Sequence, residues 1–182
     1  MQSVVLLSGS PSATSRSSAL LDYAAARLQA KGLQSVQFSV RDFPAEDLVL
    51  GRYESPAFAE LHRRVGEAPA LIVSTPVYKA AYAGGFKTML DVLPQTALRG
   101  KTVLPLVTGG SPAHQLVIDY ALKPVLSALG ATDLLQGVYL VDGQYQLTAD
   151  GTLSFLGDLQ ERVDRAVDQI VASVRGRAPA SA

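Results

Sequence analysis

The chain has 182 residues, 48% of them hydrophobic, which is enough to fill the core of one domain. Its 16 basic and 16 acidic side chains balance, so nothing in the charge indicates a nucleic-acid partner or an anionic membrane surface. The absence of cysteine excludes disulfides, iron–sulfur clusters and thiol redox chemistry. The two histidines, His62 and His114, lie far apart in sequence, so we expect no metal site. Any redox chemistry therefore requires an organic cofactor.

The amino-terminal residues, MQSVVLLSGSPS, contain a short apolar run without a basic start. This run is shorter than the core of a signal peptide or a membrane span. We therefore expect a cytoplasmic protein that does not enter a membrane.

Five apolar segments and five helical patterns alternate along the chain. The pattern begins with a strand, a helix, a strand and a helix, at residues 3–8, about 18–30, 35–40 and 56–67. It continues in the same order at residues 70–75, 84–93, 102–108 and 117–129. A last strand and a last helix follow at residues 137–142 and 156–174. We expect one domain over residues 1–175 and a frayed tail over residues 176–182.

Three local signals complicate this pattern. Pro105 lies inside the strand 102–108, and an internal proline normally places a strand at the edge of a sheet. Pro124 lies inside the helix 117–129, and residues 43–48, FPAEDL, are expected to form a loop. The alternation as a whole still predicts an α/β fold, in which helices cover both faces of a parallel sheet.

The loop after the first strand, GSPSATSRSS at residues 9–18, is rich in hydroxyl side chains. It matches neither the dinucleotide fingerprint GxGxxG nor a P-loop. It does provide hydroxyl and backbone donors, the positive charge of Arg16 and the start of a helix, which together suit a terminal phosphate. The alternative interpretation is a serine-rich turn that caps a helix, with Arg16 in solvent.

The loop after the third strand, TPVYKAAYAGGFK at residues 75–87, places Tyr78 and Tyr82 before two glycines. Aromatic rings, together with glycines that allow a close approach, suit the face and edge of a flat heterocycle. Either tyrosine could instead pack at a subunit interface, and the two roles can coexist.

The loop after the fourth strand, TGGSPAH at residues 108–114, contains adjacent glycines whose backbone N–H groups can approach the pyrimidine-like end of a flavin. The alternative is a flexible turn with His114 on the surface. Because ligands of open α/β sheets bind beyond the carboxyl ends of the strands, the three loops converge on one ligand. Its ends are a phosphomonoester and a planar ring, so FMN fits better than a dinucleotide.

At these loops the sequence resembles the NADPH-dependent FMN reductase family. GSPSATSRSS is similar to that family's phosphate loop, and TPVYKAAYAGGFKTMLD to its flavin-ring loop. TGGSPAH and DYALKPVLSALGA are similar to its third loop and the next helix. The resemblance runs from Val4 to about Val141, and its most specific stretches resemble the flavin reductase of the two-component alkanesulfonate monooxygenase system. It implies a flavodoxin-like three-layer sandwich, with a five-stranded parallel sheet in the order 2-1-3-4-5 and helices on both faces.

Carried over to this chain, the resemblance implies a role for each loop. The residues that would hold the FMN phosphate are Ser10, Arg16, Ser17 and Ser18. Those that would flank the flavin ring are Thr75, Pro76, Val77 and Tyr78, and those that would close its polar edge are Thr108, Gly109 and Gly110. Tyr120 corresponds to an extra residue that makes a π-bulge at a tetramer interface, although an ordinary core or interface tyrosine is the alternative. Tyr82 is a second interface candidate.

The implied reaction is hydride transfer from NADPH or NADH to the N5 atom of FMN. This step needs no side-chain acid or base, so we assign no catalytic side chain, and the protein contributes positioning. The resemblance further implies that reduced FMN leaves for an FMNH2-dependent monooxygenase, and that the chain forms a homotetramer.

Other functions remain open at this point. A quinone or azo reductase would retain FMN, a flavodoxin-type electron carrier would hold it tightly without reacting well with NADPH, and a binding protein would oxidise no NAD(P)H. The balanced charge and the two-tyrosine loop argue against the carrier. The residues do not decide between NADPH and NADH.

Overall fold

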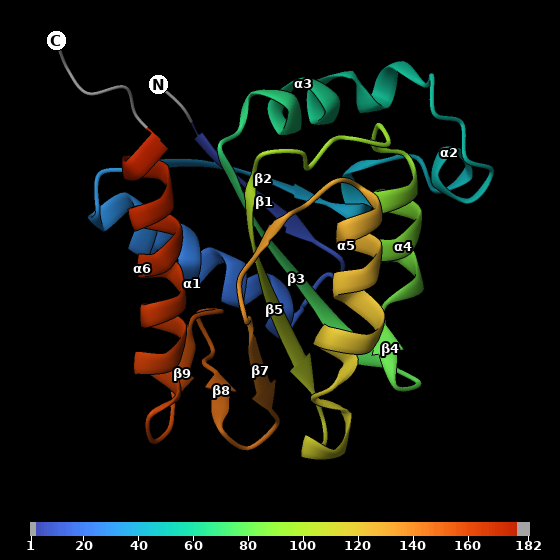
Figure 1. Cartoon of the computed structure of the whole chain (residues 1–182). Coiled ribbons are helices and arrows are strands. Elements are labelled where there is room, and N and C mark those ends of the chain that lie inside the picture. Colours follow the sequence, from blue (N-terminus) through green and yellow to red (C-terminus); the bar gives the residue numbers. More distant parts are fainter. Residues whose placement is uncertain (1–2, 178–182) are drawn as a thin grey trace, which may run out of the picture.

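The computed structural model describes residues 3–177, in which a central sheet lies between two layers of helices (Figure 1). The strands that follow the predicted pattern are β1 (Ser3–Ser8), β2 (Gln34–Ser39), β3 (Ala70–Tyr78), β5 (Thr102–Gly109) and β7 (Val138–Val141). They are parallel and lie in the order β2-β1-β3-β5-β7. This is the predicted order 2-1-3-4-5, so the flavodoxin-like topology is confirmed.

Each face of the sheet carries its own hydrophobic core. Along β1, Val4 and Leu6 face the layer that contains α1 (Arg16–Ala30) and α6 (Leu159–Arg177). Val5 and Leu7 face the opposite layer, which contains α3 (Ala59–Glu67), α4 (Gly84–Asp91) and α5 (Lys123–Ala128). The four side chains are at most 1% exposed. A strand buried on both faces must be apolar throughout, which is why β1 reads as a continuous apolar run.

Pro105 lies in an interior strand, as the predicted order requires, although an internal proline normally places a strand at the edge of a sheet. β5 pairs with β3 along one side, and its other side pairs first with β6 (Asp133–Leu134) and then with β7. Pro105 falls between these two pairings, where the neighbouring strand is interrupted and no backbone donor is required. The segment between β6 and β7 contains Gly137, which has a φ of 86°. Because Gly137 has no side chain, this segment can approach the Pro105 carbonyl closely.

Several short elements were not expected from the sequence. Residues 43–48 are not a plain loop, because α2 (Ala45–Val49) follows Pro44, with two acidic residues in its first turn and Leu48 buried. In the described part of the chain, the central sheet has seven strands rather than the predicted five, because β6 and the short antiparallel strand β4 (Ala81–Tyr82) join it. The short strands β8 (Tyr145–Leu147) and β9 (Leu153–Phe155) form a separate hairpin. Within residues 3–177 there are also four one-turn segments, namely η1 (Val40–Asp42), η2 (Pro56–Phe58), η3 (Pro112–His114) and η4 (Ile118–Leu122).

The last helix differs from its predicted limits at both ends. α6 begins at Leu159 rather than Leu156, because β9 ends at Phe155 and Gly157 adopts a φ of 62°. It continues to Arg177, beyond the expected domain limit at residue 175, so residues 176 and 177 are helical. The rest of the predicted tail, residues 178–182, lies outside the described residues. Within residues 3–177, no helix is both long and apolar enough to cross a membrane.

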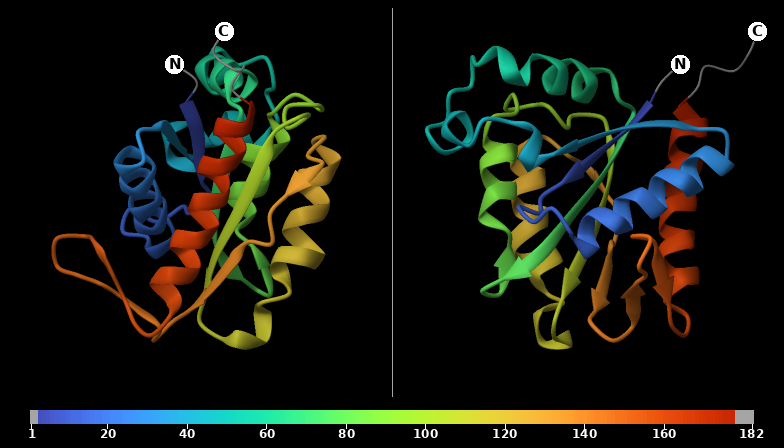
Figure 2. Two further views of the ribbon diagram at one scale, coloured as in Figure 1. Left: turned by 60° about the vertical axis from the view of Figure 1, so that its left-hand side comes forward. Right: turned by 180° about the vertical axis from the view of Figure 1, so that it is seen from behind.

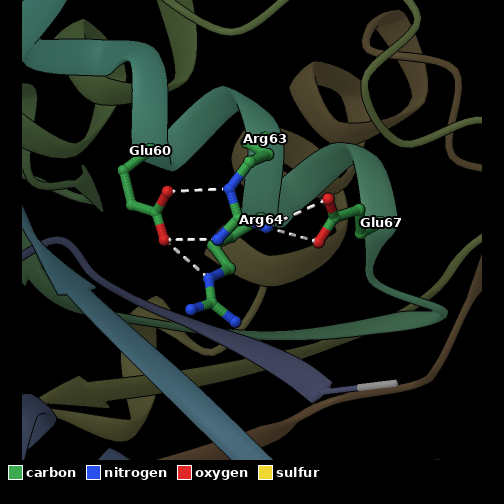
Figure 3. A network of polar contacts seen from close by, with 4 residues as sticks. All are labelled: Glu60, Arg63, Arg64 and Glu67. Atoms are coloured by element: carbon green, nitrogen blue, oxygen red, sulfur yellow. Dashed lines mark hydrogen bonds and ion pairs between the residues drawn. The ribbon is translucent and has the colours of Figure 1, made fainter. Parts of the chain in front are cut away.

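The outer surface of α3 carries a network of ion pairs (Figure 3). Glu60 accepts hydrogen bonds from Arg63 at 2.6 Å and from Arg64 at 2.7 Å, which lower the pKa of Glu60 to about 2. Arg63 also pairs with Glu67 at 2.8 Å. Because these groups are exposed, water and salt screen their attraction and the pairs add little stability. The helix is held on the sheet by its apolar side, where Leu61 is fully buried.

We expect Gly9→Ala to destabilise the fold. A Cβ at Gly9 would lie 2.4 Å from the Cβ of Phe86, which is fully buried in α4 and cannot move aside without disturbing the core. The free energy of unfolding should fall by about 1–3 kcal/mol, as for other overpacked cores, and urea denaturation measures it. Gly66→Ala is the matched control, because no atom beyond the neighbouring residues and the backbone of α3 itself lies within 4 Å of its Cβ position. Equal denaturation midpoints for the two variants would contradict the expectation.

Candidate functional site

Three of the strands bring their following loops to one edge of the sheet. Ser8 of β1 pairs with Ser74 of β3, and Pro76 of β3 pairs with Thr108 of β5, so the carboxyl ends of these strands lie side by side. The loops line a cavity of about 500 Å³. The predicted residues that line it are Ser10, Arg16, Ser17, Pro76, Val77, Tyr78, Thr108, Gly109 and Gly110.

The loop between β1 and α1 supplies hydroxyl groups at one end of this cavity. Ser10 is almost fully buried, and its Oγ accepts a hydrogen bond from the amide of Ser12 at 3.2 Å. Ser15 has an extended backbone and caps α1, because its Oγ accepts from the amide of Ser18 at 3.3 Å. The first turn of α1 holds Arg16 and contains no acidic residue. The start of α1 therefore combines the positive end of the helix dipole with the guanidinium group of its first residue, Arg16.

Two of the predicted residues, Ser18 and Thr75, do not line the cavity. The Oγ of Ser18 lies 2.8 Å from the Oγ of Ser8 and links the start of α1 to β1. Thr75 is fully buried, and its Oγ1 accepts from the amide of Ala83 at 3.1 Å. Both hydroxyls stabilise the loops through contacts outside the cavity.

The second loop folds back as a hairpin between β3 and β4. Tyr78 pairs with Ala81, which leaves a two-residue turn in which Lys79 and Ala80 have φ values of 50° and 63°. Positive φ at both central residues is the signature of a type I′ turn, which normally contains Asn and Gly. Tyr78 lines the cavity and remains half exposed. Tyr82 instead packs edge to face against Phe86, outside the cavity, and burial raises its pKa.

The first glycine of the third loop leaves room for a neighbouring tyrosine. A Cβ at Gly109 would lie 2.0 Å from the hydroxyl of Tyr139, which donates to the Ser111 carbonyl at 2.7 Å. The Gly109 carbonyl accepts from the amide of Asp142 at 2.9 Å. The glycine thus lets β5 and β7 stay in contact where the loop begins.

Sequence reasoning missed part of the cavity wall. Asp142 follows β7, and its Oδ2 lies 2.6 Å from Nη1 of Arg16. Tyr145 of β8 donates from its hydroxyl to Oδ1 of Asp142 at 3.0 Å, and Leu147 also lines the cavity. Asp142 stands at the carboxyl edge of the sheet, so the rule that identified the other loops would have found it. Tyr145 and Leu147 belong to the β8–β9 hairpin, which projects from the body of the molecule and was not expected (Figure 2).

A second cavity, of about 620 Å³, adjoins the first, and Val77 and Gly110 line both. Its other described lining residues are Lys79, Ala80, Ser111 and His114, which include no carboxylate. A larger, mainly apolar cavity of about 680 Å³ lies elsewhere, beside the segment that precedes β5 and thus at the amino-terminal edge. Across residues 3–177, no group of three or more acidic or histidine side chains is placed to hold a metal ion.

The predicted helix 117–129 consists of two parts. Residues Ile118–Leu122 form a π-helical turn, η4, in which the amide of Lys123 donates to the Ile118 carbonyl, five residues back. Pro124 follows at the start of α5, where its missing N–H costs least. Tyr120 lies in the π-helical turn, and it is 80% exposed.

A doubly wound parallel sheet with a hydroxyl-rich loop, an aromatic hairpin and a Gly-Gly loop around one edge cavity defines a flavodoxin-like α/β protein. Residues 2–146 match the model of the NADPH-dependent FMN reductase family, and the chain belongs to this family. Its activity is the reduction of FMN by NAD(P)H, so it is an oxidoreductase.

Relatives support this membership over most of the chain. An FMN reductase (NADPH) of Pseudomonas putida KT2440 is 50% identical over 91% of this chain and 84% of its own length. The FMN reductase (NADPH) of Escherichia coli K12 is 47% identical over 91% of this chain and 86% of its own length. The solved apo structure of an NADH:FMN oxidoreductase has a TM-score of 0.85 and 37% identity, covering 95% of this chain and 90% of that chain.

We expect Tyr145→Phe to change the alkaline stability. Burial and the hydrogen bond to Asp142 raise the pKa of Tyr145 well above its usual 10.0, so the folded state disfavours the tyrosinate. The stability that this raised pKa represents is complete below pH 10.0 and is lost as the pH rises further. The free energy of unfolding, measured by denaturation from about pH 8 to pH 11, should fall more steeply for the parent protein than for the variant. Parallel curves would rule out this effect.

Proposed function

We propose that the cavity of about 500 Å³ binds FMN, with the phosphate at the β1–α1 loop and the ring between the β3–β4 hairpin and the β5 loop. The observation that carries this proposal is that the two ends of the cavity offer different chemical groups. One end offers the hydroxyls of Ser10 and Ser17, the guanidinium of Arg16 and the start of α1, which suit a phosphate. The other end offers the Tyr78 ring and the backbone of Gly109 and Gly110, which suit a flat ring.

FMN, when bound, supplies the ring nitrogen that accepts the hydride. The protein orients the two reactants, and no side chain in the cavity has to move a proton. In this proposal Pro76 and Val77 support the ring, while Thr108 approaches its polar edge. Ser18 and Thr75 keep the two loops in shape through their contacts with Ser8 and Ala83.

We further propose that the adjoining cavity of about 620 Å³ admits the nicotinamide nucleotide. It shares Val77 and Gly110 with the first cavity, so a ligand there would lie beside the ring. Lys79 and His114 are its only titratable lining residues among those described, and basic groups suit the phosphates of NAD(P)H. The two curated relatives are named for NADPH and the solved structure for NADH, so NADPH is proposed as the donor, with NADH possible.

Reduced FMN is proposed to be a product that leaves for an FMNH2-dependent monooxygenase, in alkanesulfonate desulfonation according to the resemblance noted above. The open cavity supports this, because Tyr78 and the Arg16 side chain are 48% and 55% exposed. NADPH consumption by purified protein, with and without added FMN, tests it. Consumption that requires free FMN supports the proposal, whereas protein that retains flavin and ignores added FMN contradicts release.

Arg16→Ala is expected to weaken FMN binding by about 1.5–3 kcal/mol, the scale of a charged hydrogen bond. Titration of flavin fluorescence measures the dissociation constant. Arg165→Ala is the control, because Arg165 pairs with Glu161 on the outer surface of α6 and does not line the cavity. Unchanged FMN affinity would remove Arg16 from the phosphate site.

Tyr120→Ala is expected to alter assembly or flavin release. We propose that the chain is a homotetramer and that the π-helical turn places the exposed Tyr120 at an interface. The variant should show a lower mass in solution or a changed rate of flavin release, measured by light scattering and stopped-flow fluorescence. Leu156→Ala, which removes another exposed apolar side chain, is the control. Unchanged mass, kinetics and flavin retention would exclude this role for Tyr120.

A further inference from the structure

The positive charge of the cavity is already paired. Nη1 of Arg16 lies 2.6 Å from Oδ2 of Asp142, and the two side chains are 55% and 40% exposed. Arg16 begins α1, whereas Asp142 follows β7, so the pair joins the first and last segments of the cavity wall. Both residues line the cavity.

Asp142 is held in place from two further directions. Its Oδ1 accepts a hydrogen bond at 3.0 Å from Tyr145, whose side chain is 4% exposed. Its backbone amide donates to the Gly109 carbonyl at 2.9 Å. A carboxylate anchored at its backbone and at one oxygen cannot readily turn away from the cavity. It therefore faces whatever approaches Arg16.

A phosphomonoester brings a charge of about −1.5 to −2 at neutral pH. Among the described lining residues, only Arg16 and Asp142 carry charge, so the cavity offers such a group no net positive charge. A bound phosphate would share the guanidinium with Asp142 and be repelled by its carboxylate. Hydroxyls and backbone amides would supply the remaining attraction.

We propose that Asp142 sets the affinity for FMN by competing with the flavin phosphate for Arg16. This inference depends on the proposed FMN site and extends it to regulation of that site. Asp142 weakens binding of the phosphate end and so allows flavin to exchange. It acts through Arg16 and by repulsion of the phosphate, and it has no part in hydride transfer.

Asp142→Asn tests this role, because asparagine keeps the size of the side chain and can still accept from Tyr145. The variant should bind FMN about three- to tenfold more tightly, and FMN should dissociate more slowly by a similar factor. Riboflavin, which lacks the phosphate, should bind parent and variant equally. Flavin fluorescence titration and stopped-flow measurements provide these values.

Two further variants separate the local effect from a general one. Glu161→Gln makes the same change in net charge on the outer face of α6, and it should leave FMN affinity unchanged. In an Arg16→Ala background, Asp142→Asn should tighten FMN binding less than it does in the parent, since its competition for the guanidinium is gone. If circular dichroism shows that the Asp142→Asn variant does not fold, Asp142→Ser replaces it as a second neutral variant. The expected change in FMN binding is the same.

FMN binding that is unchanged or weaker in a folded neutral variant overturns the proposal. An equal gain for riboflavin also overturns it, because the effect would then not involve the phosphate. A parent protein that binds riboflavin and FMN with equal affinity, both unaffected by Arg16→Ala, would instead disprove the proposed phosphate site itself. The two failures are therefore distinguishable.

Discussion

The backbone hydrogen bond from Gly9 to Ser74, 2.8 Å long, joins the carboxyl end of β1 to β3 at the point where the chain leaves the core. The space for this contact exists because Gly9 has no side chain and the buried ring of Phe86 fills the position instead. From here the hydroxyl-rich loop and the β3–β4 hairpin depart at the same edge, and the pairing of Pro76 with Thr108 adds the third loop. The cavity thus depends on parallel register more than on any single ligand-directed side chain.

The electrostatics of this cavity suit a ligand that arrives and leaves. Tight phosphate sites concentrate uncompensated donors and positive charge, as a P-loop does with its lysine. Here the one guanidinium is paired with Asp142, and both side chains are partly exposed to water, which would weaken the interaction of each with a bound phosphate. A flavin that serves as a substrate needs this balance, whereas a flavin retained through many turnovers does not.

The sheet order and the three loops could be predicted because they depend on local patterns: apolar runs, punctuating glycines, and the rule that ligands meet strand ends. The individual roles of hydroxyls could not. Ser17 and Ser18 are adjacent and chemically identical, yet only Ser17 lines the cavity, since Ser18 turns back to Ser8. Tyr145 escaped prediction because its hairpin is short and its partner, Asp142, precedes it across a turn with no periodic signal. Pairing with a neighbouring strand, rather than propensity, decided the place of Pro105.

The turn at the tip of the β3–β4 hairpin shows how tertiary contacts override local preference. Positive φ at Lys79 and Ala80 costs these residues about 1–3 kcal/mol each, a cost that glycine would avoid. The conformation persists because the buried hydroxyl of Thr75 binds the amide of Ala83 and fixes the returning strand. The turn also places Lys79 in the lining of the adjoining cavity, where glycine would offer no side-chain donor. The strain therefore lies in the wall of the adjoining cavity, at the two residues that join β3 to β4.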